Sequence, residues 1–132
     1  MKKLIILMCI SFIVLTACNQ SNDKQTTPPK QEIKENVRYK MFPTENMWTF
    51  LKLDTSNGKI WQVQYAIDES FRGEIELNNN ALVSDGAAEN GRFTLYPTRN
   101  VYNFILLDQI DGKMWQVQWS LEENNRGLIP LQ

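Results

Sequence analysis

Histidine is absent from the 132 residues of this chain. The absence of histidine removes the commonest general base, the usual zinc ligand and the middle residue of a Ser-His-Asp triad. The chain also lacks a glycine-rich phosphate loop and a Gly-x-Ser-x-Gly nucleophile elbow. An enzyme built on this sequence would have to work with carboxylates, lysine or tyrosine.

Cysteine is nearly absent as well, and both cysteines, Cys9 and Cys18, lie close to the N-terminus. The first 18 residues have the form of a targeting signal. Lys2 and Lys3 precede an almost wholly apolar run at residues 4–15, which is too short to cross a bilayer comfortably. This segment is therefore set apart from the folded part of the protein.

The targeting segment ends in the residues LTAC at positions 15–18. This motif resembles the lipobox of bacterial lipoproteins, and the resemblance covers residues 1–18 only. It implies that Cys18 receives a diacylglyceryl group, that residues 1–17 are removed, and that Cys18 becomes the acylated first residue. The alternative is an ordinary secretory signal with an incidental cysteine. With Cys9 removed and Cys18 acylated, the mature chain has no disulfide and depends on packing for its stability.

Residues 18–36 are expected to form the lipidated cysteine and a disordered tether. The stretch after Cys18 is rich in Gln, Asn, Thr and Lys, and Ile33 is its only aliphatic residue. Such a composition buries too little apolar surface to offset the entropy lost on ordering. The 18 residues at positions 19–36 would reach roughly 60 Å when fully extended and span about 25 Å as a flexible chain.

The lipobox resemblance implies a cell-envelope protein that is attached to a membrane through Cys18. Asn19 is not the aspartate that commonly retains lipoproteins in the inner membrane, so the outer membrane is expected where one exists, and otherwise the plasma membrane. Without the two signal lysines the chain has 12 basic and 15 acidic residues. No basic patch offsets phosphate repulsion, so nucleic acid is not expected as a partner.

The rest of the chain, residues 37–132, contains an internal repeat. Residues 38–78 align without a gap with residues 92–132 at an offset of 54, and 18 of the 41 positions are identical. The repeats are expected to cover residues 37–78 and 92–132, with a polar linker at residues 79–91. A gapless duplication of this kind indicates one supersecondary unit that is used twice.

Each repeat has the alternating pattern of β-strands. The stretch KIWQVQYAI at residues 59–67 returns as KMWQVQWSL at residues 113–121. Period-two alternation is typical of half-buried strands, and one face of each is expected in the core. The residues expected there are Trp61, Val63, Tyr65 and Ile67 in the first repeat, and Trp115, Val117, Trp119 and Leu121 in the second.

Asn57-Gly58 and Asp111-Gly112 each join this strand to the one before it, at residues 47–54 and 101–108. Asn-Gly and Asp-Gly tolerate positive φ and favour tight hairpins. A two-residue turn and a three-residue turn with a bulge are both compatible with the sequence.

Two shorter strands complete each repeat, so the sequence predicts an all-β domain of two four-stranded antiparallel meanders. They are expected to pack with pseudo-two-fold symmetry as a sandwich or a small barrel, because one repeat alone is too short to bury a core. A further alternative is two blades of a propeller that closes only by oligomerisation.

Two duplicated features are candidates for a site. Asp54 and Asp108 end equivalent strands, and they are the pair that a carboxylate-dependent hydrolase would use. The alternative role for these two residues is to accept hydrogen bonds from turn amides. The segment Asp54-x-Ser56-x-Gly58 lacks the further ligands of a calcium loop, and neither a metal nor another cofactor is expected.

The second candidate is a ligand-binding surface of aromatic rings and amides, a combination that suits sugar rings and their hydroxyls. Its members are Phe42, Trp48, Phe50, Gln62, Gln64, Tyr96, Tyr102, Phe104, Gln116 and Gln118. The alternative is that these rings complete the packing of central strands. The sequence therefore favours a non-catalytic binding or structural module for a glycan or an envelope protein, with a hydrolase as the alternative.

Overall fold

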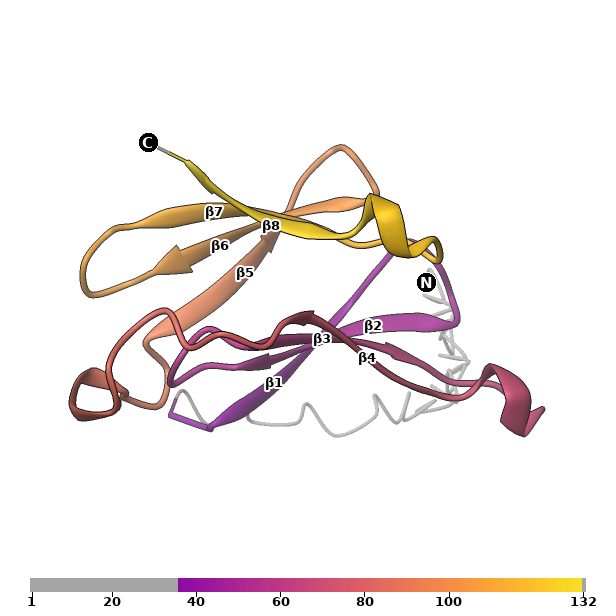
Figure 1. The fold of residues 1–132 in the computed structure, drawn as a ribbon, viewed down its shortest axis with the longest axis horizontal. Coiled ribbons are helices and arrows are strands. Elements are labelled where there is room, and N and C mark those ends of the chain that lie inside the picture. Colours follow the sequence, from indigo (N-terminus) through magenta and orange to yellow (C-terminus); the bar gives the residue numbers. More distant parts are fainter. Residues whose placement is uncertain (1–35, 132) are drawn as a thin grey trace, which may run out of the picture. The chain divides into compact units, whose positions relative to one another are not determined.

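The computed structural model describes residues 36–131, which form eight β-strands in two four-stranded antiparallel sheets (Figure 1). Sheet 1 contains β1 (Tyr39–Pro43), β2 (Thr49–Asp54), β3 (Ile60–Gln64) and β4 (Gly73–Asn78). Sheet 2 contains β5 (Phe93–Pro97), β6 (Asn103–Asp108), β7 (Met114–Gln118) and β8 (Gly127–Leu131). Neighbouring strands follow one another in sequence in both sheets, which confirms the all-β fold of two tandem meanders.

The remaining elements between residues 36 and 131 are three short 3₁₀ turns, at Glu69–Phe71, Asp85–Ala87 and Glu123–Asn125. No helix in this described range is long or apolar enough to cross a membrane. The predicted lipobox and the first 18 positions of the predicted tether segment, residues 18–35, lie outside the described residues.

The loop that joins β2 to β3 is longer than either predicted turn. The amide of Asp54 donates to the carbonyl of Lys59 at 2.9 Å, so four residues, 55–58, lie between this pair. Gly58 closes the loop at φ 80°, and its amide donates to the carbonyl of Asp54 at 3.0 Å. The β6–β7 loop repeats this geometry, with Gly112 at φ 71°. The expectation of a residue with positive φ is confirmed, whereas the two shorter loop lengths are wrong.

The two sheets pack face to face around one hydrophobic core, as a sandwich. Strand β2 lies against β5, and β4 lies against β8. The buried apolar side chains come from both repeats: Leu51, Leu53, Ile60, Phe93, Leu95, Phe104, Leu106, Val117 and Trp119. Neither sheet could cover its apolar face without the other.

The linker between the repeats helps to hold this arrangement. Leu82 packs against the core, and its amide donates to the carbonyl of Asn57 at 2.8 Å. The amide of Phe93, at the start of β5, donates to the carbonyl of Thr55 at 2.8 Å. The first hairpin loop thus positions both the linker and the first strand of the second sheet.

Equivalent strands of the two repeats bury opposite faces. Ile60 is 0% exposed, whereas its equivalent, Met114, is 43% exposed. Phe93 is 0% exposed, whereas its equivalent, Tyr39, is 51% exposed. A two-fold axis between the sheets would bury the same face of each, so the symmetry differs from the expected pseudo-two-fold relation.

Each sheet therefore has an inner face, which meets the other sheet, and an outer face. The inner face of sheet 1 includes Phe42, Leu51, Leu53, Ile60, Gln62 and Ile75, and its outer face includes Tyr39, Met41, Phe50, Lys52, Trp61, Val63, Glu74 and Glu76. The inner face of sheet 2 includes Leu95, Phe104, Leu106, Trp115, Val117 and Leu128, and its outer face includes Tyr96, Ile105, Leu107, Met114, Gln116, Ile129 and Leu131.

This arrangement corrects part of the predicted core. Val117 and Trp119 are buried as expected, and Trp115 is partly buried against the core. In the first repeat the expectation is wrong: Trp61 and Val63 lie on the outer face, and Tyr65 is exposed. The reason is that sheet 1 packs on sheet 2 through the opposite face, the one that carries Ile60 and Gln62. Ile67 and Leu121 are also exposed, since both follow the last residue of their strand.

Candidate functional site

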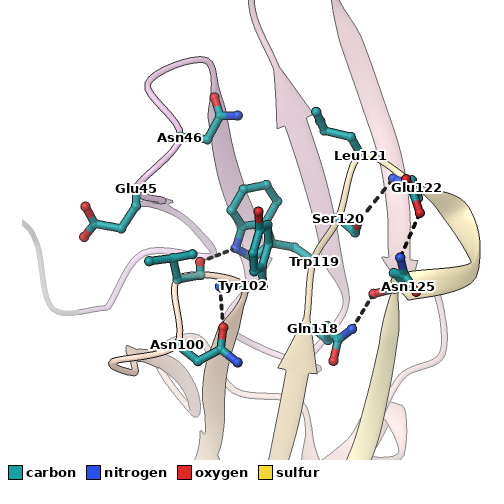
Figure 2. A pocket seen from close by; sticks show the side chains of 11 residues that line it. Glu45, Asn46, Asn100, Tyr102, Gln118, Trp119, Ser120, Leu121, Glu122 and Asn125 are labelled. Carbon is teal, nitrogen blue, oxygen red and sulfur yellow. Dashed lines mark hydrogen bonds between the residues drawn. The ribbon is translucent and has the colours of Figure 1, made fainter.

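A cleft of about 580 Å³ opens where the β5–β6 turn meets the segment that follows β7 (Figure 2). The β1–β2 turn of the first repeat forms its other edge. The lining residues are Glu45, Asn46, Asn100, Val101, Tyr102, Gln118, Trp119, Ser120, Leu121, Glu122 and Asn125. The cleft therefore combines residues of both repeats.

A fixed turn positions the cleft residue Tyr102. Thr98 Oγ1 donates to the carbonyls of Asn100 and Asn103 at 3.0 Å each, and the Asn100 side chain accepts from the Tyr102 amide at 3.1 Å. Short polar side chains of this kind stabilise turns by bonding to nearby backbone groups. The Pro-Thr-x-Asn sequence occurs in both repeats, and in the first the Asn46 side chain accepts from the Trp48 amide at 2.9 Å.

An aromatic pair forms the centre of the cleft. The rings of Tyr102 and Trp119 lie 5.4 Å apart at an angle of 46°, and Figure 2 shows them between the two polar edges. Trp119 is buried, and its Nε1 donates to the carbonyl of Val101 at 2.9 Å. Tyr102 is 53% exposed. Trp119 therefore supports the ring of Tyr102, which is accessible to a ligand.

Hydrogen-bonded polar side chains form one edge of the cleft. Gln118 Nε2 donates to the carbonyl of Asn125 at 2.9 Å, and Asn125 Nδ2 donates to Glu122 Oε2 at 2.9 Å. Arg126 Nε donates to the carbonyl of Ser120 at 2.7 Å, which closes the same loop just before β8 begins. The amide and carboxylate groups on this edge are thus held in place beside the aromatic pair.

A second cleft of about 350 Å³ lies at the equivalent place in the first repeat. It is lined by Asn46, Trp48, Gln64, Tyr65, Ala66, Ile67, Phe71 and Leu121. The first seven of these are the repeat equivalents of seven residues that line the first cleft. The two clefts share Asn46 and Leu121, so they adjoin one another.

The second cleft keeps the aromatic pair and loses much of the polar lining. The rings of Trp48 and Tyr65 lie 5.6 Å apart, so the tryptophan and the tyrosine have exchanged places relative to the first cleft. Ala66 and Phe71 stand where the first cleft has Ser120 and Asn125. Ile67, which is 95% exposed, adds further apolar surface, so the lining of this cleft is mainly apolar.

The structure brings only some of the ten predicted ligand-binding residues together. Four line the clefts, two in each: Trp48 and Gln64 in the second cleft, Tyr102 and Gln118 in the first. The other six, which lie on sheet faces, are Phe42, Phe50, Gln62, Tyr96, Phe104 and Gln116. The ten residues do not form one aromatic and amide surface.

Burial explains part of this separation. Gln62 and Phe104 lie in the interior between the sheets, and Phe42 packs against the core. Phe50 lies on the outer face of sheet 1, whereas its repeat equivalent, Phe104, is buried between the sheets. The sequence could not show this, because the repeated strands turn opposite faces inward.

Several lining residues were not predicted, among them Asn100, Ser120, Glu122 and Asn125. Asn100 carries a signal in the sequence, since the Pro-Thr-x-Asn turn is duplicated. Trp119 is buried, as the alternation predicts, but its ring also supports the cleft. No duplicated motif marks the segment after β7 as part of the cleft, because only the folding of that loop brings its residues there.

The duplicated carboxylates accept hydrogen bonds from their own hairpin turns. Asp54 and Asp108 are buried, and each faces the arginine that precedes the first strand of its own repeat. Arg92 Nε and Nη2 donate to the two oxygens of Asp108 at 3.0 and 2.8 Å. The backbone amides of Ile110 and Asp111 also donate to Asp108, at 3.0 and 3.2 Å.

These contacts set the charge state of both carboxylates. Burial raises the pKa of Asp108, but the hydrogen bonds from Arg92 and from the turn amides lower it by more, so the pKa lies below its usual value. In the same way, burial raises the pKa of Asp54, and the hydrogen bonds from Ser56 and Arg38 more than offset this effect. Both groups are therefore ionised and saturated with donors at neutral pH.

Within the described residues, no cluster of three or more acidic, cysteine or histidine side chains could hold a metal ion. No family model, curated protein or solved structure matches this chain. The function therefore has to be argued from the chemistry of the clefts themselves.

Proposed function

We propose that this protein is a lipid-anchored bacterial envelope protein whose β-sandwich binds a glycan, without catalysis, in the cleft around Tyr102. One observation carries the proposal: a half-exposed tyrosine ring is supported by a buried tryptophan and is flanked by fixed amide and carboxylate groups. The lipobox-like sequence at residues 15–18 supports the anchor, with Cys18 as the lipid site. Asn19 favours the outer membrane where the cell has one.

The chemistry of the cleft suits a sugar. The C–H face of a pyranose stacks on an aromatic ring, and Tyr102 offers such a ring beside Trp119. The hydroxyl groups of the sugar need donors and acceptors at its edges. Gln118 and Asn125 supply amides on one side, and Asn46 supplies one on the other (Figure 2). A few convergent polar groups of this kind fix the orientation of a ligand.

Binding is favoured over the alternative hydrolase. A glycosidase needs one carboxyl group that can give up a proton and a second that can attack or activate water. Asp54 and Asp108 each accept hydrogen bonds from an arginine and from a turn, and neither lines either of the two clefts described above. Their geometry supports a role in holding the hairpin loops.

The second cleft favours an additional candidate ligand, an envelope protein. Ile67 is almost fully exposed beside Phe71, Trp48 and Tyr65. Exposed apolar clusters with aromatic anchors are typical of protein-binding sites. Cross-linking from position 71, where Phe71 is 68% exposed in the same cleft, should capture a partner in intact cells that the Ile67→Asp change releases. The same captured partners with and without that change would contradict this candidate.

The glycan proposal is tested by titrating the full chain, in detergent, with envelope polysaccharides and peptidoglycan fragments while tryptophan fluorescence is followed. Trp119 lies under Tyr102, so a bound sugar should change the emission in a saturable way. Tyr102→Ala should weaken binding at least about tenfold. Tyr96→Ala is the matched control, because Tyr96 belongs to the same sheet and is similarly exposed, at 50%.

No saturable change with any polymer, or an equal loss in both variants, would overturn glycan binding in this cleft. The anchor is tested separately by labelling cells with a radioactive fatty acid. Cys18→Ser should abolish incorporation, and unchanged labelling in that variant would contradict the lipid assignment.

A further inference from the structure

The outer face of sheet 2 is apolar to a degree that is unusual for a solvated sheet. The register places Tyr96, Ile105, Gln116 and Ile129 in one row across the outer face of sheet 2. A second row contains Thr94, Leu107, Met114 and Leu131. Neither row contains a charged residue, although antiparallel sheets usually turn a polar face to water.

The first row matches the inner face of sheet 1 position by position, and three of the four residues in the second row have the apolar equivalents Leu53, Ile60 and Leu77. The repeat equivalents of the first row are Phe42, Leu51, Gln62 and Ile75, which have the same chemical character in the same order. In sheet 1 that row packs against sheet 2. The outer face of sheet 2 is therefore a second copy of a surface that the protein already uses in its core.

The outer face of sheet 1 is likewise a second copy of the inner face of sheet 2. Tyr39, Met41, Phe50, Trp61 and Val63 are the repeat equivalents of Phe93, Leu95, Phe104, Trp115 and Val117. Tyr39 and Met41 are about half exposed, and the rings of Tyr39 and Trp61 lie 6.4 Å apart. In sheet 2 the equivalent residues are covered by sheet 1.

We propose that a second copy of this chain covers these faces, with the outer face of sheet 2 of one copy packed on the outer face of sheet 1 of the next. This contact would repeat, between two chains, the contact that joins the two sheets within one chain. It is independent of the proposed glycan site, which lies at the end of the sheets that carries the β1–β2 and β5–β6 turns.

The proposed contact is head-to-tail. Each copy uses two different faces, since equivalent strands bury opposite sides. Strand β2 lies against β5 and β4 against β8, so the strand order runs in the same direction across the internal contact. Repeating one such step gives a heterologous assembly, which is a closed ring or an open stack. Propellers assembled from four-stranded blades close in this way.

Three charged residues make the proposed contact weaker than the internal one. Lys52, Glu74 and Glu76 stand where sheet 2 has Leu106, Leu128 and Pro130. Lys52 pairs with Glu74 at 2.5 Å, and its Nζ lies 4.6 Å from the centre of the Trp61 ring. Covering this ion pair costs desolvation energy, so the association is reversible and depends on concentration.

The test uses the full chain in detergent, by sedimentation velocity over a range of protein concentrations up to about 100 μM, where contacts with a micromolar Kd are populated. Wild type should form dimers and larger species. Met41→Glu blocks the outer face of sheet 1, and Ile129→Glu blocks the outer face of sheet 2. Each should weaken self-association at least about tenfold, because a carboxylate would be buried in an apolar contact.

Mixing the two variants separates a head-to-tail contact from a symmetric one. Met41→Glu keeps an intact sheet 2 face and Ile129→Glu keeps an intact sheet 1 face, so the mixture should form a one-to-one dimer and nothing larger. Ile110→Glu is the matched control: Ile110 is 57% exposed, as Ile129 is 53% exposed, but it lies on the β6–β7 loop and on neither face. That variant should associate as wild type does.

A wild-type chain that sediments as a single copy at every concentration would overturn the proposal. So would association that survives in one variant alone, or a mixture that does not dimerise, since both indicate a different contact. Near-ultraviolet circular dichroism checks that each variant is folded. Tyr39→Glu and Met114→Glu, on the same two faces, form a second pair that must give the same pattern.

Discussion

The equivalent glutamines Gln62 and Gln116 provide the sharpest test of the opposite burial of the two repeats. Both occur in the repeated sequence WQVQ at the same position. Gln62 is 0% exposed, and neither its Oε1 nor its Nε2 has a hydrogen-bond partner among residues 36–131. Gln116 lies on the outer face of sheet 2, between Ile105 and Ile129, and is partly exposed.

The size of the effect follows from this difference. In protein mutational data, a buried amide without a hydrogen bond costs about 1–3 kcal/mol. Gln62→Leu removes the two polar atoms and keeps a similar volume, so the free energy of unfolding should rise by about 1–3 kcal/mol. In a domain of this size, 1 kcal/mol raises Tm by about 4–8 °C. Gln116→Leu should change the free energy of unfolding by less than about 0.5 kcal/mol.

The measurement is thermal and urea unfolding of both variants beside wild type, at a concentration where the chain sediments as one copy. The urea m-value should be unchanged, since neither substitution alters the surface exposed on unfolding. Equal effects of the two substitutions would refute the opposite burial of the repeats. A loss of stability in Gln62→Leu alone would show that the buried amide has a stabilising partner.

Two further predictions concern the hairpin loops. Gly58→Ala and Gly112→Ala both place a side chain at positive φ, which costs about 1–2 kcal/mol. An added Cβ at Gly58 would lie 2.7 Å from Leu82 Cδ1, whereas one at Gly112 would have no described residue except its chain neighbours within 4 Å. Urea unfolding should therefore show Gly58→Ala to be the more destabilising by at least about 1 kcal/mol, and equal losses would contradict the packing of Leu82. Asp108→Asn should lower the free energy of unfolding at pH 7 by about 3 kcal/mol, because it leaves Arg92 buried with Asp111 as its remaining carboxylate. Since the folded-state pKa of Asp108 is depressed, the stability it contributes is complete above its unfolded pKa of about 4 and is lost as the pH falls through the folded value. Unfolding from pH 7 to pH 2 should therefore show a smaller acid-dependent loss in Asp108→Asn than in wild type, and an identical loss would contradict the role of this ion pair.

Much of the fold could be predicted because it depends on local patterns. The alternation at residues 59–67 predicted a strand, and β3 covers Ile60–Gln64. The Asn57-Gly58 pair predicted a hairpin, and Gly58 does adopt positive φ. The loop length was not predictable, because the Asp54 side chain accepts from Ser56 and so stabilises a longer loop.

The candidate site was predicted less well, since it depends on loops that meet only in the folded chain. Tyr102 and Gln118 were identified from their residue types, and both line the first cleft. Glu122 and Asn125 belong to a short loop, and their place beside Tyr102 depends on hydrogen bonds within that loop. No pattern in the sequence indicates those bonds.

The sequence alone determined the strands, the duplicated unit and the positions of the turn glycines, since each depends on residues that are close together in the chain. The tertiary structure decided which face of each strand is buried. An alternating strand marks two faces, but with apolar residues on both it does not say which of them meets a partner. The sequence did contain one signal: Lys52 and Glu74 stand where the second repeat has Leu106 and Leu128. These charges mark the face of sheet 1 that is turned to solvent. Burial was settled only by the packing of one sheet against the other, because the hydrophobic effect acts on the area removed from water and carries no preference for a particular face.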